Sequence, residues 1–427
     1  MSTLNNQFSI IFITNSGQYK LDMAYLLQCY FIEDIFNMCM VGKLRFIDAQ
    51  NIVEQGPLIG NEMIGIIVGE ENRQFLFSTF KVMDVTAVSA IRSSEYPIIE
   101  LIMTDPLFKP FTMSKFSKTW KFSEPIKNDR MVNKILEEMC DSKLDTWMFE
   151  QTNESIDNYT INGWSPAQAI QYLIRRSSGS IFDAPGYLFF QSSHFSENTA
   201  QNNLCTIEYL LNQDLESSLG GTGYEYVFDS GNLYYPNKIL NFKKSGTDHY
   251  AYRKLAGGKK ISFNFDTKTI LEKTYTYNTM MNSGKITVLG NKSLFKDIST
   301  DINISPTDIE IVADYDERAL ENVMYYDFIK KYIIQQAVSI EVPGYPSRPC
   351  GDLILIRWPS TLSGEVKNKN LDGIYLVKSV TWNFMNRPPY FTQKLVLLKN
   401  GYSDSDVDLV EPAKKRTTGG TTIGGAA

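Results

Sequence analysis

Apolar and polar residues alternate in short runs through residues 6–105, and each run is bounded by Gly, Asn, Asp or Pro. The runs are FSIIFITN, YLLQCYFIEDIFNM, VGKLRFIDA, EMIGIIVG, RQFLFSTFKVMDVTAV and YPIIELIMTD. A period of two is typical of strands that bury one face, and no helical pattern separates these runs. The region therefore predicts an antiparallel sheet or a barrel that ends near the proline-rich segment DPLFKPF at 105–111.

A helical period appears in three later segments. KNDRMVNKILEEMCDS (127–142) has apolar residues near i, i+3, i+4 spacing, and SPAQAIQYLIRRSS (165–178) opens with Ser165 and Pro166, a good N-cap and first-turn pair. DYDERALENVMYYDFIKKYIIQQA (314–337) is acidic at its front and basic in its middle, as a helix favours. WMFEQT (147–152) reads as a short strand, so residues 127–178 are predicted to be a mixed segment.

Strand patterns return on both sides of the third helix. Before it we expect strands in GYLFFQSS, TIEYLLNQ and YEYVFDSGNLYYPNKILNF, and a β-hairpin in KISFNFDTKTILEKTYTYNT (260–279) with 266–268 at its turn. After it come VSIEVPGYP, GDLILIRWP, GIYLVKSVTWNF and FTQKLVLLKN, which end near Gly401. The tail KKRTTGGTTIGGAA predicts a flexible extension or a segment that orders on a partner. Two small β units therefore bracket a larger mixed middle.

Composition limits the function classes. A length of 427 residues favours two or three domains, and the 24 Tyr and 25 Phe suit strands and large interfaces. A net charge of −6 argues against a protein that grips nucleic acid through phosphates. The five cysteines are scattered without a CxxC, so we expect reduced, buried thiols. The N-terminus lacks a signal-peptide pattern and the apolar runs are too short to span a bilayer, so no membrane partner is expected.

The total charge hides two β units of opposite sign. Residues 1–110 contain 7 Lys+Arg and 12 Asp+Glu, a net of −5, whereas residues 341–400 contain 8 Lys+Arg and 4 Asp+Glu, a net of +4. Complementary potentials orient interfaces, so this difference favours contact between the two units, within one chain or between chains.

Candidate catalytic groups are sparse. The only histidines are His194 and His249, and neither has a metal-ligand partner at the usual spacing. HExxH, GxSxG and GxxxxGK[ST] motifs are absent, and LGGTGYEY (219–226) is predicted to be a loop. Asp141, Asp145 and Glu150 are predicted to form a solvated acidic face, although paired carboxylates leave no fixed signature. We therefore expect no catalytic residue, no cofactor and no metal.

The segment VEQGPLIGNEMIGIIVG (53–69) presents a Gly-Pro corner and a lone carboxylate before a strand. We expect Gly56 and Gly60 to be available for positive φ, Pro57 to fix its own φ, and the corner to reverse the chain between strands. Glu62 is expected at the entry of the next strand, where it binds a neighbour's backbone N–H groups or a basic side chain. An ordinary surface hairpin is the alternative.

The order of these segments resembles the phage baseplate hub proteins. LRFIDAQ followed by GPLIGNE and a strand is similar to the start of that family. SIEVPGYPSRPCGDLILIRWP, GIYLVKSVTWNF and FTQKLVLLKNG are similar to its second barrel, in which a Gly-Asp pair introduces a strand and a terminal hairpin closes the unit. The family includes the tail hubs of contractile phages and the N-terminal half of the valine-glycine-repeat spike proteins. The resemblance covers both ends of the chain, the hairpin near 261–277 less closely, and 112–235 by position.

The resemblance implies a β-rich α+β fold in which two tube-type β-barrel domains bracket a mixed α/β middle region. The first barrel would occupy 1–111, the mixed α+β middle domain 112–235, and a β-rich connecting domain 236–313. A helix plus the second barrel would occupy 314–401, and 402–427 would be a flexible tail. Gly56, Pro57, Gly60, Glu62, Gly344, Gly351 and Asp352 are the candidate interface or structural residues.

The resemblance also implies a function as a structural baseplate hub. Three copies would form a pseudo-six-fold ring that adapts the hexameric tail tube to the trimeric central spike and leaves a channel through which DNA passes without tight binding. Other baseplate proteins and the tape measure protein are further expected partners. The protein would be made in the host cytoplasm and reside in the virion, at the tail baseplate. The alternatives are a tail-associated cell-wall hydrolase and a glycan-binding tail protein.

Overall fold

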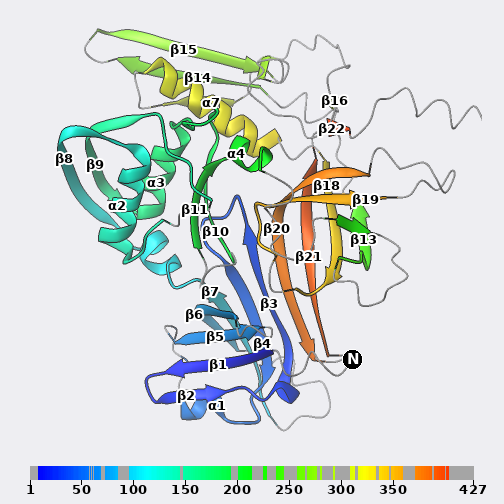
Figure 1. The fold of residues 1–427 in the computed structure, drawn as a ribbon. Coiled ribbons are helices and arrows are strands. Elements are labelled where there is room, and N and C mark those ends of the chain that lie inside the picture. Colours follow the sequence, from blue (N-terminus) through cyan, green and yellow to red (C-terminus); the bar gives the residue numbers. More distant parts are fainter. Residues whose placement is uncertain are drawn as a thin grey trace, which may run out of the picture.

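The computed structural model describes most of the chain, in the segments that follow. They are residues 8–56, 58, 60, 62–68, 73–84, 96–144, 148–193, 201–213, 225–227, 237–244, 257–264, 267–276, 279–280, 292–293, 308–312, 316–332, 336–345, 348–358, 371–386, 389–399 and 401–402. Figure 1 shows a large curved sheet, a mixed layer of helices and strands beside it, and a small sheet with a helix above that layer.

Thirteen strands form the large sheet, and its main path runs in the order β13-β18-β21-β20-β3-β4-β7-β6-β5-β1-β2. The N-terminal strands are β1 (Phe8–Thr14), β2 (Gly17–Lys20), β3 (Leu26–Asp34), β4 (Val41–Ile47), β5 (Met63–Val68), β6 (Arg73–Asp84) and β7 (Ile98–Thr104). All pairs along this path are antiparallel. The antiparallel strands predicted from the apolar runs are confirmed.

The C-terminal strands continue the same sheet. They are β12 (Glu225–Val227), β13 (Asn241–Lys244), β18 (Gln336–Pro343), β19 (Leu353–Arg357), β20 (Gly373–Asn386) and β21 (Pro389–Lys399). The long strand β20 pairs with β19 through residues 373–376 and with β3 through 379–385, while β21 follows it on the other side. A register shift between Val377 and Ser379 lies where the partner of β20 changes. Strand β20 thus joins the two strand-rich ends of the chain.

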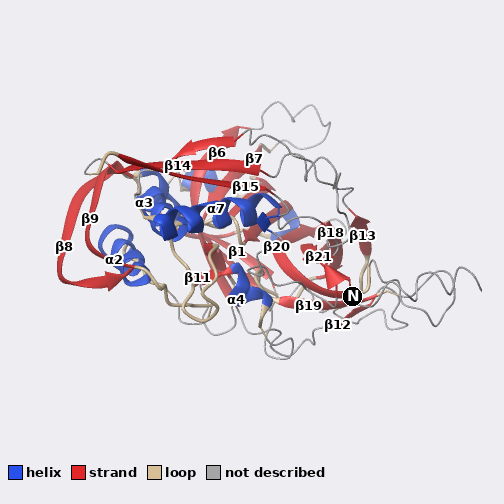
Figure 2. Ribbon diagram, turned by 90° about the horizontal axis from the view of Figure 1, so that it is seen from above, coloured by secondary structure: helices blue, strands red, loops and turns tan. Residues whose placement is uncertain are grey.

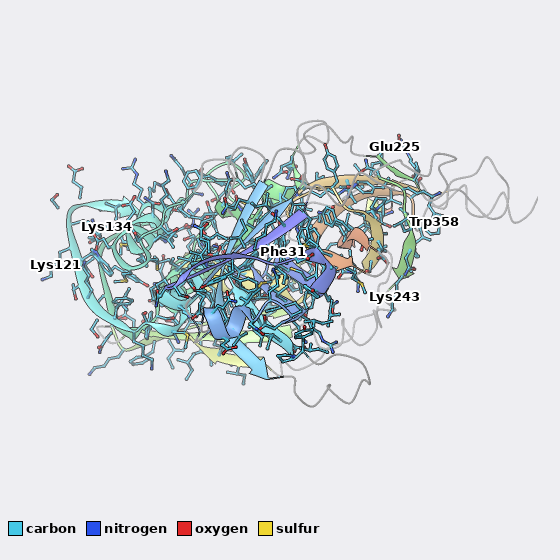
Figure 3. The ribbon with its side chains drawn as sticks, turned by 90° about the horizontal axis from the view of Figure 1, so that it is seen from below. Phe31, Lys121, Lys134, Glu225, Lys243 and Trp358 are labelled. Carbon is cyan, nitrogen blue, oxygen red and sulfur yellow. The ribbon has the colours of Figure 1, made fainter. Side chains whose placement is uncertain are left out.

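An aromatic cluster fills the core where these two ends meet. Trp382 on β20 is fully buried and stacks on Phe31 of β3, with 5.2 Å between ring centroids. Phe75 of β6 and Phe391 of β21 lie 5.1 and 5.8 Å from the Trp382 ring. Phe31 lies among the side chains near the centre of Figure 3. The apolar core is therefore continuous between the N-terminal and C-terminal strands.

The middle of the chain builds a second core. Helices α2 (Asn128–Cys140) and α3 (Pro166–Arg175) pack together and are covered by a ribbon of β8 (Phe116–Lys127) and β9 (Ser155–Trp164). Figure 2 shows the ribbon on the far side of these helices from the large sheet. Ser165 Oγ accepts a hydrogen bond from Gln168 N, and Gln168 Oε1 accepts one from Ser165 N, a capping box. Both predicted helices and the predicted N-cap are confirmed.

Several features of this middle region differ from the sequence prediction. Strands β8 and β11 (Gln201–Thr206) were not predicted, and residues 148–152 of the predicted strand WMFEQT form isolated bridges instead of a strand. Strand β9 was not predicted, because most of SIDNYTINGW is exposed and its apolar signal is therefore weak. TIEYLLNQ was predicted to be a strand and contains helix α4 (Ile207–Leu211) instead. Thr206 Oγ1 accepts a hydrogen bond from Tyr209 N and caps this helix, and the spacing of Ile207, Leu210 and Leu211 buries one helical face.

The small sheet has the order β15-β14-β17 and packs on the third predicted helix. Its strands are β14 (Gly257–Asn264), β15 (Thr269–Thr276) and β17 (Asp308–Ile311), and the helix is α7 (Glu317–Tyr332). Asn264 pairs with Thr269 across the hairpin, and Lys268 at the turn has a φ of 54°. The predicted hairpin and helix are confirmed. Figure 1 shows this sheet as the outermost layer, above α7.

The remaining elements are short connections and additional strand pairs. They are η1 (Met23–Tyr25), α1 (Ile52–Gln55), the π-helix η3 (Lys109–Met113), β10 (Tyr187–Ser192), β11 (Gln201–Thr206), β16 (Lys292–Ser293) and β22 (Gly401–Tyr402). The β-rich α+β class is confirmed, whereas the predicted domain boundaries stay a prediction. All five cysteines are free, and all but the half-buried Cys140 are buried. Within the described segments, no helix has both the length and the apolar character needed to span a bilayer.

Candidate functional site

The Gly-Pro corner closes on its own chain. Gly60 has a φ of +91°, as predicted, and its N–H donates to Glu62 Oε2 at 3.0 Å. Gly56 has a φ of −131°, so the prediction of positive φ there is wrong. Its hydrogen side chain is required for another reason, because a Cβ would lie 2.8 Å from Thr14 Oγ1. Pro57 lies outside the described residues.

The corner does not reverse the chain between neighbouring strands, as the sequence had suggested. Strand β4 pairs with β3 and β7, whereas β5 pairs with β1 and β6, so the segment between them crosses the sheet. The crossing segment starts at Asp48, just after β4. The Asp48 carboxylate accepts hydrogen bonds from the backbone N–H groups of Ile52 and Val53 at 2.7 and 3.1 Å. Glu62 is buried just before β5, and its role at an interface stays a prediction.

The C-terminal candidates lie where the backbone comes close to β20 and β21. Gly344 donates its N–H to the Phe391 carbonyl at 2.8 Å, and a Cβ at this position would lie 2.2 Å from the Phe391 ring. Gly351 has a φ of +95° and donates to the Val377 carbonyl at 2.8 Å. Asp352 follows it and immediately precedes β19, as the family pattern implies.

A further buried carboxylate, outside the candidates predicted from the sequence, lies where the N-terminal, middle and C-terminal parts of the chain meet. Glu33 on β3 is fully buried and accepts hydrogen bonds from Ser193 N at 3.1 Å, Cys350 N at 3.3 Å and Trp382 Nε1 at 2.7 Å. Ser193 Oγ donates a further, short hydrogen bond. These donors come from the end of β10, the segment before β19, and β20. We call Glu33, Ser193, Cys350, Asp352 and Trp382 the junction, because it ties the N-terminal strands to the middle and C-terminal parts.

The electrostatics of the junction oppose ionisation. Burial raises the pKa of Glu33 to about 7, and the hydrogen bonds from Ser193, Cys350 and Trp382 keep it from rising further. Burial and then the neighbouring Glu33 raise the pKa of Asp352 well above its usual range. Neither carboxyl oxygen of Asp352 has a hydrogen-bond partner among the described residues. Since Glu33 receives four donors and Asp352 receives none, Asp352 keeps its proton to a higher pH than Glu33.

Asp352→Asn is expected to raise the free energy of unfolding at pH 7 by about 1–3 kcal/mol. The amide has nearly the shape of the protonated acid, and it removes the gain that the unfolded chain obtains by ionising Asp352. Urea denaturation at pH 7 and pH 3 checks this, because the gain should vanish at pH 3, where the unfolded aspartate is also protonated. A change in stability at pH 7 that is no more favourable than the change at pH 3 would show that the folded chain holds Asp352 as an anion.

A second cluster of charges fastens the small sheet to the middle of the chain. Lys260 of β14 is 1% exposed, and its Nζ lies 2.6 Å from Asp327 Oδ2 of α7 and 2.5 Å from Glu310 Oε2 of β17. Arg175 at the end of α3 contacts the same two carboxylates at 2.9 and 3.0 Å. Although burial raises the pKa of Glu310, hydrogen bonds from Arg175 and Lys260 lower it to about 2.

No group of three or more His, Cys, Asp or Glu side chains in the described segments is placed to hold a metal ion. His194, His249 and Asp145 lie outside those segments. Glu150 was predicted to belong to a solvated acidic face, but it is 1% exposed, and its carboxylate accepts hydrogen bonds from Thr206 Oγ1 at 2.6 Å and Thr206 N at 3.2 Å.

The sequence did contain a signal for Glu33. Leu26, Cys29, Phe31 and Glu33 are the buried residues of β3, so the carboxylate is in phase with the apolar positions of its strand. A single charge at a core-facing position of an apolar strand indicates a buried, hydrogen-bonded group. Lys260 gave no such signal, because it lies beside Lys259 in a polar stretch.

Comparison with solved structures finds two phage tail proteins that share this architecture along nearly their whole length. The tail protein from Neisseria meningitidis MC58 has a TM-score of 0.55 at 9% identity, covering 92% of this chain and 97% of that chain. The 43 kDa tail protein of prophage MuSo2 from Shewanella oneidensis has a TM-score of 0.55 at 10% identity, covering 92% and 98%. No family model matches the sequence, and no curated protein matches it either.

At 9% and 10% sequence identity, the comparison with these two tail proteins establishes a similarity of fold. The chain has the fold of phage tail proteins, and the resemblance to the baseplate hub family that its sequence predicted is confirmed at that level. The match covers 92% of this chain and nearly all of both tail proteins, so the likeness concerns the architecture as a whole.

Proposed function

We propose that the chain is the structural hub of a phage tail baseplate or a related injection machine. Three copies form a pseudo-six-fold ring that joins a hexameric tail tube to a trimeric central spike. The observation that carries this proposal is the likeness to two tail proteins over 92% of the chain. In this role the chain acts through its shape and its contact surfaces, and it requires no cofactor.

The sheet architecture supports a ring of six similar units from three copies. Each copy contributes two strand-rich ends, assigned to tube-type barrels at 1–111 and 314–401, and the pairing of β3 with β20 holds them side by side. The net charges of −5 and +4 over residues 1–110 and 341–400 make contact between the two ends attractive. In a closed ring the same contact repeats between copies, so the binding energy of one modest contact is gained several times.

The overall charge supports a channel that lets DNA pass without holding it. With a net charge of −6, the chain offers no general excess of cations to exchange for the counterions of DNA. The tail tube protein, the central spike, other baseplate proteins and the tape measure protein are the partners that this role requires. The chain would be synthesised in the host cytoplasm and reside in the virion.

The oligomeric state of the purified full-length chain tests the proposed function. We expect light scattering to give three times the chain mass and negative-stain images to show a ring with a central hole. A monomer across the accessible concentration range, without rings in the images, would contradict the hub and favour the alternatives. Assays for cell-wall hydrolysis and glycan binding by the middle region would then be the next measurements.

A further inference from the structure

The outer face of the small sheet exposes a cluster of large apolar side chains. Strand register places Ile261 beside Ile311 and Phe263 beside Ile270, on the same face as Ile309. Ile311, Ile270 and Ile309 are 79%, 64% and 62% exposed, and Phe263 is 38% exposed. We call these five residues the isoleucine face. An exposed apolar group of this kind marks a surface that another molecule covers.

The opposite face of the sheet is already occupied by the same chain. Tyr275 and Lys260 point inward and are 2% and 1% exposed. Val312, just after β17, packs with Leu320 and Val323 in a small apolar cluster. Lys260 forms its ion pair with α7 on this side. The sheet is therefore held from within and presents the isoleucine face outward, above α7 in Figure 1.

The isoleucine face carries no net charge among the described residues. Lys259 and Glu272 are the charged side chains on this side of the sheet, and they pair with each other at 2.5 Å between Nζ and Oε1. The whole chain has a net charge of −6, so copies that approach through surfaces other than the oppositely charged ends repel each other. A neutral apolar surface is where two such copies can meet without opposing like charges.

We propose that the isoleucine face binds a second copy of the chain and is part of the contact between neighbouring copies in the ring. This inference rests on the proposed three-copy hub, and it names the surface by which the copies associate. Because the ion pairs of Lys260 and Arg175 fix the sheet on α3 and α7, the face is ordered before association and loses little freedom on binding. A nucleic acid or a strongly charged protein would gain nothing from it.

Ile311→Glu and Ile311→Lys in the full-length chain test the inference. Both place a charge in the proposed contact, and both are expected to weaken self-association at least tenfold in light scattering and sedimentation. Ile309→Glu is expected to do the same. Met113→Glu is the matched control, because Met113 is an apolar side chain of similar size that is 60% exposed on η3, away from the small sheet. Thermal melting should be unchanged in all four variants, since each replaced side chain is largely exposed.

The outcomes separate this inference from the proposed function. A wild-type trimer that all three isoleucine variants dissociate, and Met113→Glu does not, is the expected result. A wild-type trimer that survives these variants would overturn the isoleucine face as the contact and leave the hub standing. A wild-type chain that stays monomeric would overturn both. If Met113→Glu dissociated the trimer as strongly as Ile311→Glu, the added charge rather than the isoleucine face would be the cause, and the inference would fail.

Discussion

Trp382→Ala is expected to lower the free energy of unfolding by about 3–5 kcal/mol, which is the usual cost of removing a buried aromatic side chain. The Trp382 ring is fully buried between Phe31, Phe75 and Phe391, so its loss leaves a cavity where the two ends of the chain meet. The variant also removes the Trp382 Nε1 donor from Glu33 and leaves that carboxylate less well satisfied.

Two further variants separate these effects. Trp382→Phe keeps most of the aromatic volume and removes the N–H donor, so its cost of roughly 1–3 kcal/mol reports the hydrogen bond to Glu33. Trp164→Ala is the control, because Trp164 lies at the end of the β8–β9 ribbon with 36% of its surface exposed, and we expect roughly 1 kcal/mol or less. Urea denaturation followed by fluorescence measures all three. Equal losses for Trp382→Ala and Trp164→Ala would contradict a central role for the aromatic cluster.

Stability is expected to fall as the pH rises from about 4.5 to about 7. The folded-state pKa of Glu33 is raised to about 7, above its value of about 4.3 in an unfolded chain. The folded chain therefore binds the proton more tightly, so the contribution is complete below about pH 4.3 and is lost through pH 7. At about 1.4 kcal/mol for each pH unit, the loss is roughly 3 kcal/mol. The raised pKa values of Asp352, Asp105 and Asp34 act in the same direction.

Other carboxylates set the acid side of the profile. Hydrogen bonds from Lys118, and then from Trp120 and Lys134, outweigh burial and lower the pKa of Glu138 to about 2. Glu310 has a pKa of about 2 as well, so both stabilise the fold above about pH 4.3 and lose this contribution as the pH falls toward 2. Maximum stability is therefore expected near pH 4–5.

Urea midpoints between pH 3 and pH 8 measure this profile, and Glu33→Gln is the matched variant. Glutamine cannot ionise, so the share of Glu33 in the decline between pH 4.5 and 7, roughly 3 kcal/mol, should disappear, while the shares of Asp352, Asp105 and Asp34 remain. Its amide group would face the donors of Ser193 and Trp382, so the variant should also be less stable at every pH. Parallel curves for the wild type and Glu33→Gln would assign the decline to other groups.

The local pattern of the chain was sufficient to predict most of its elements. The period-two runs became β1, β3 to β7 and β18 to β21, since alternation depends only on which face of a strand is buried. The Ser165-Pro166 pair marked the start of α3, because a capping box is built from residues within one turn. The prediction of a strand in TIEYLLNQ was wrong, because a short apolar run is compatible with a strand and with a helix. The N-cap at Thr206 and the packing of the apolar side chains favour helix α4.

The residues that hold the molecule together were harder to predict because their partners are distant in sequence. Glu33 shares a hydrogen bond with a residue 349 positions away at Trp382, and Arg175 shares one with a residue 152 positions away at Asp327. The strand pattern predicts that the Glu33 side chain points inward, but it does not identify the groups that donate hydrogen bonds to its carboxylate. The predicted candidates Gly344, Gly351 and Asp352 lie close to these contacts, because a tight backbone approach leaves glycine as its local mark.

By itself, the sequence determined the strand-rich character of both ends, the three main helices, the hairpin, the opposite charges of the two ends and the resemblance to baseplate hubs. Tertiary structure alone decided that β20 pairs with β3, that Glu33 and Asp352 share one buried junction, and that the isoleucine face points outward. The physical reason is that periodicity records which side of an element is buried. The identity of the partner depends on chain segments that only the folded state brings together.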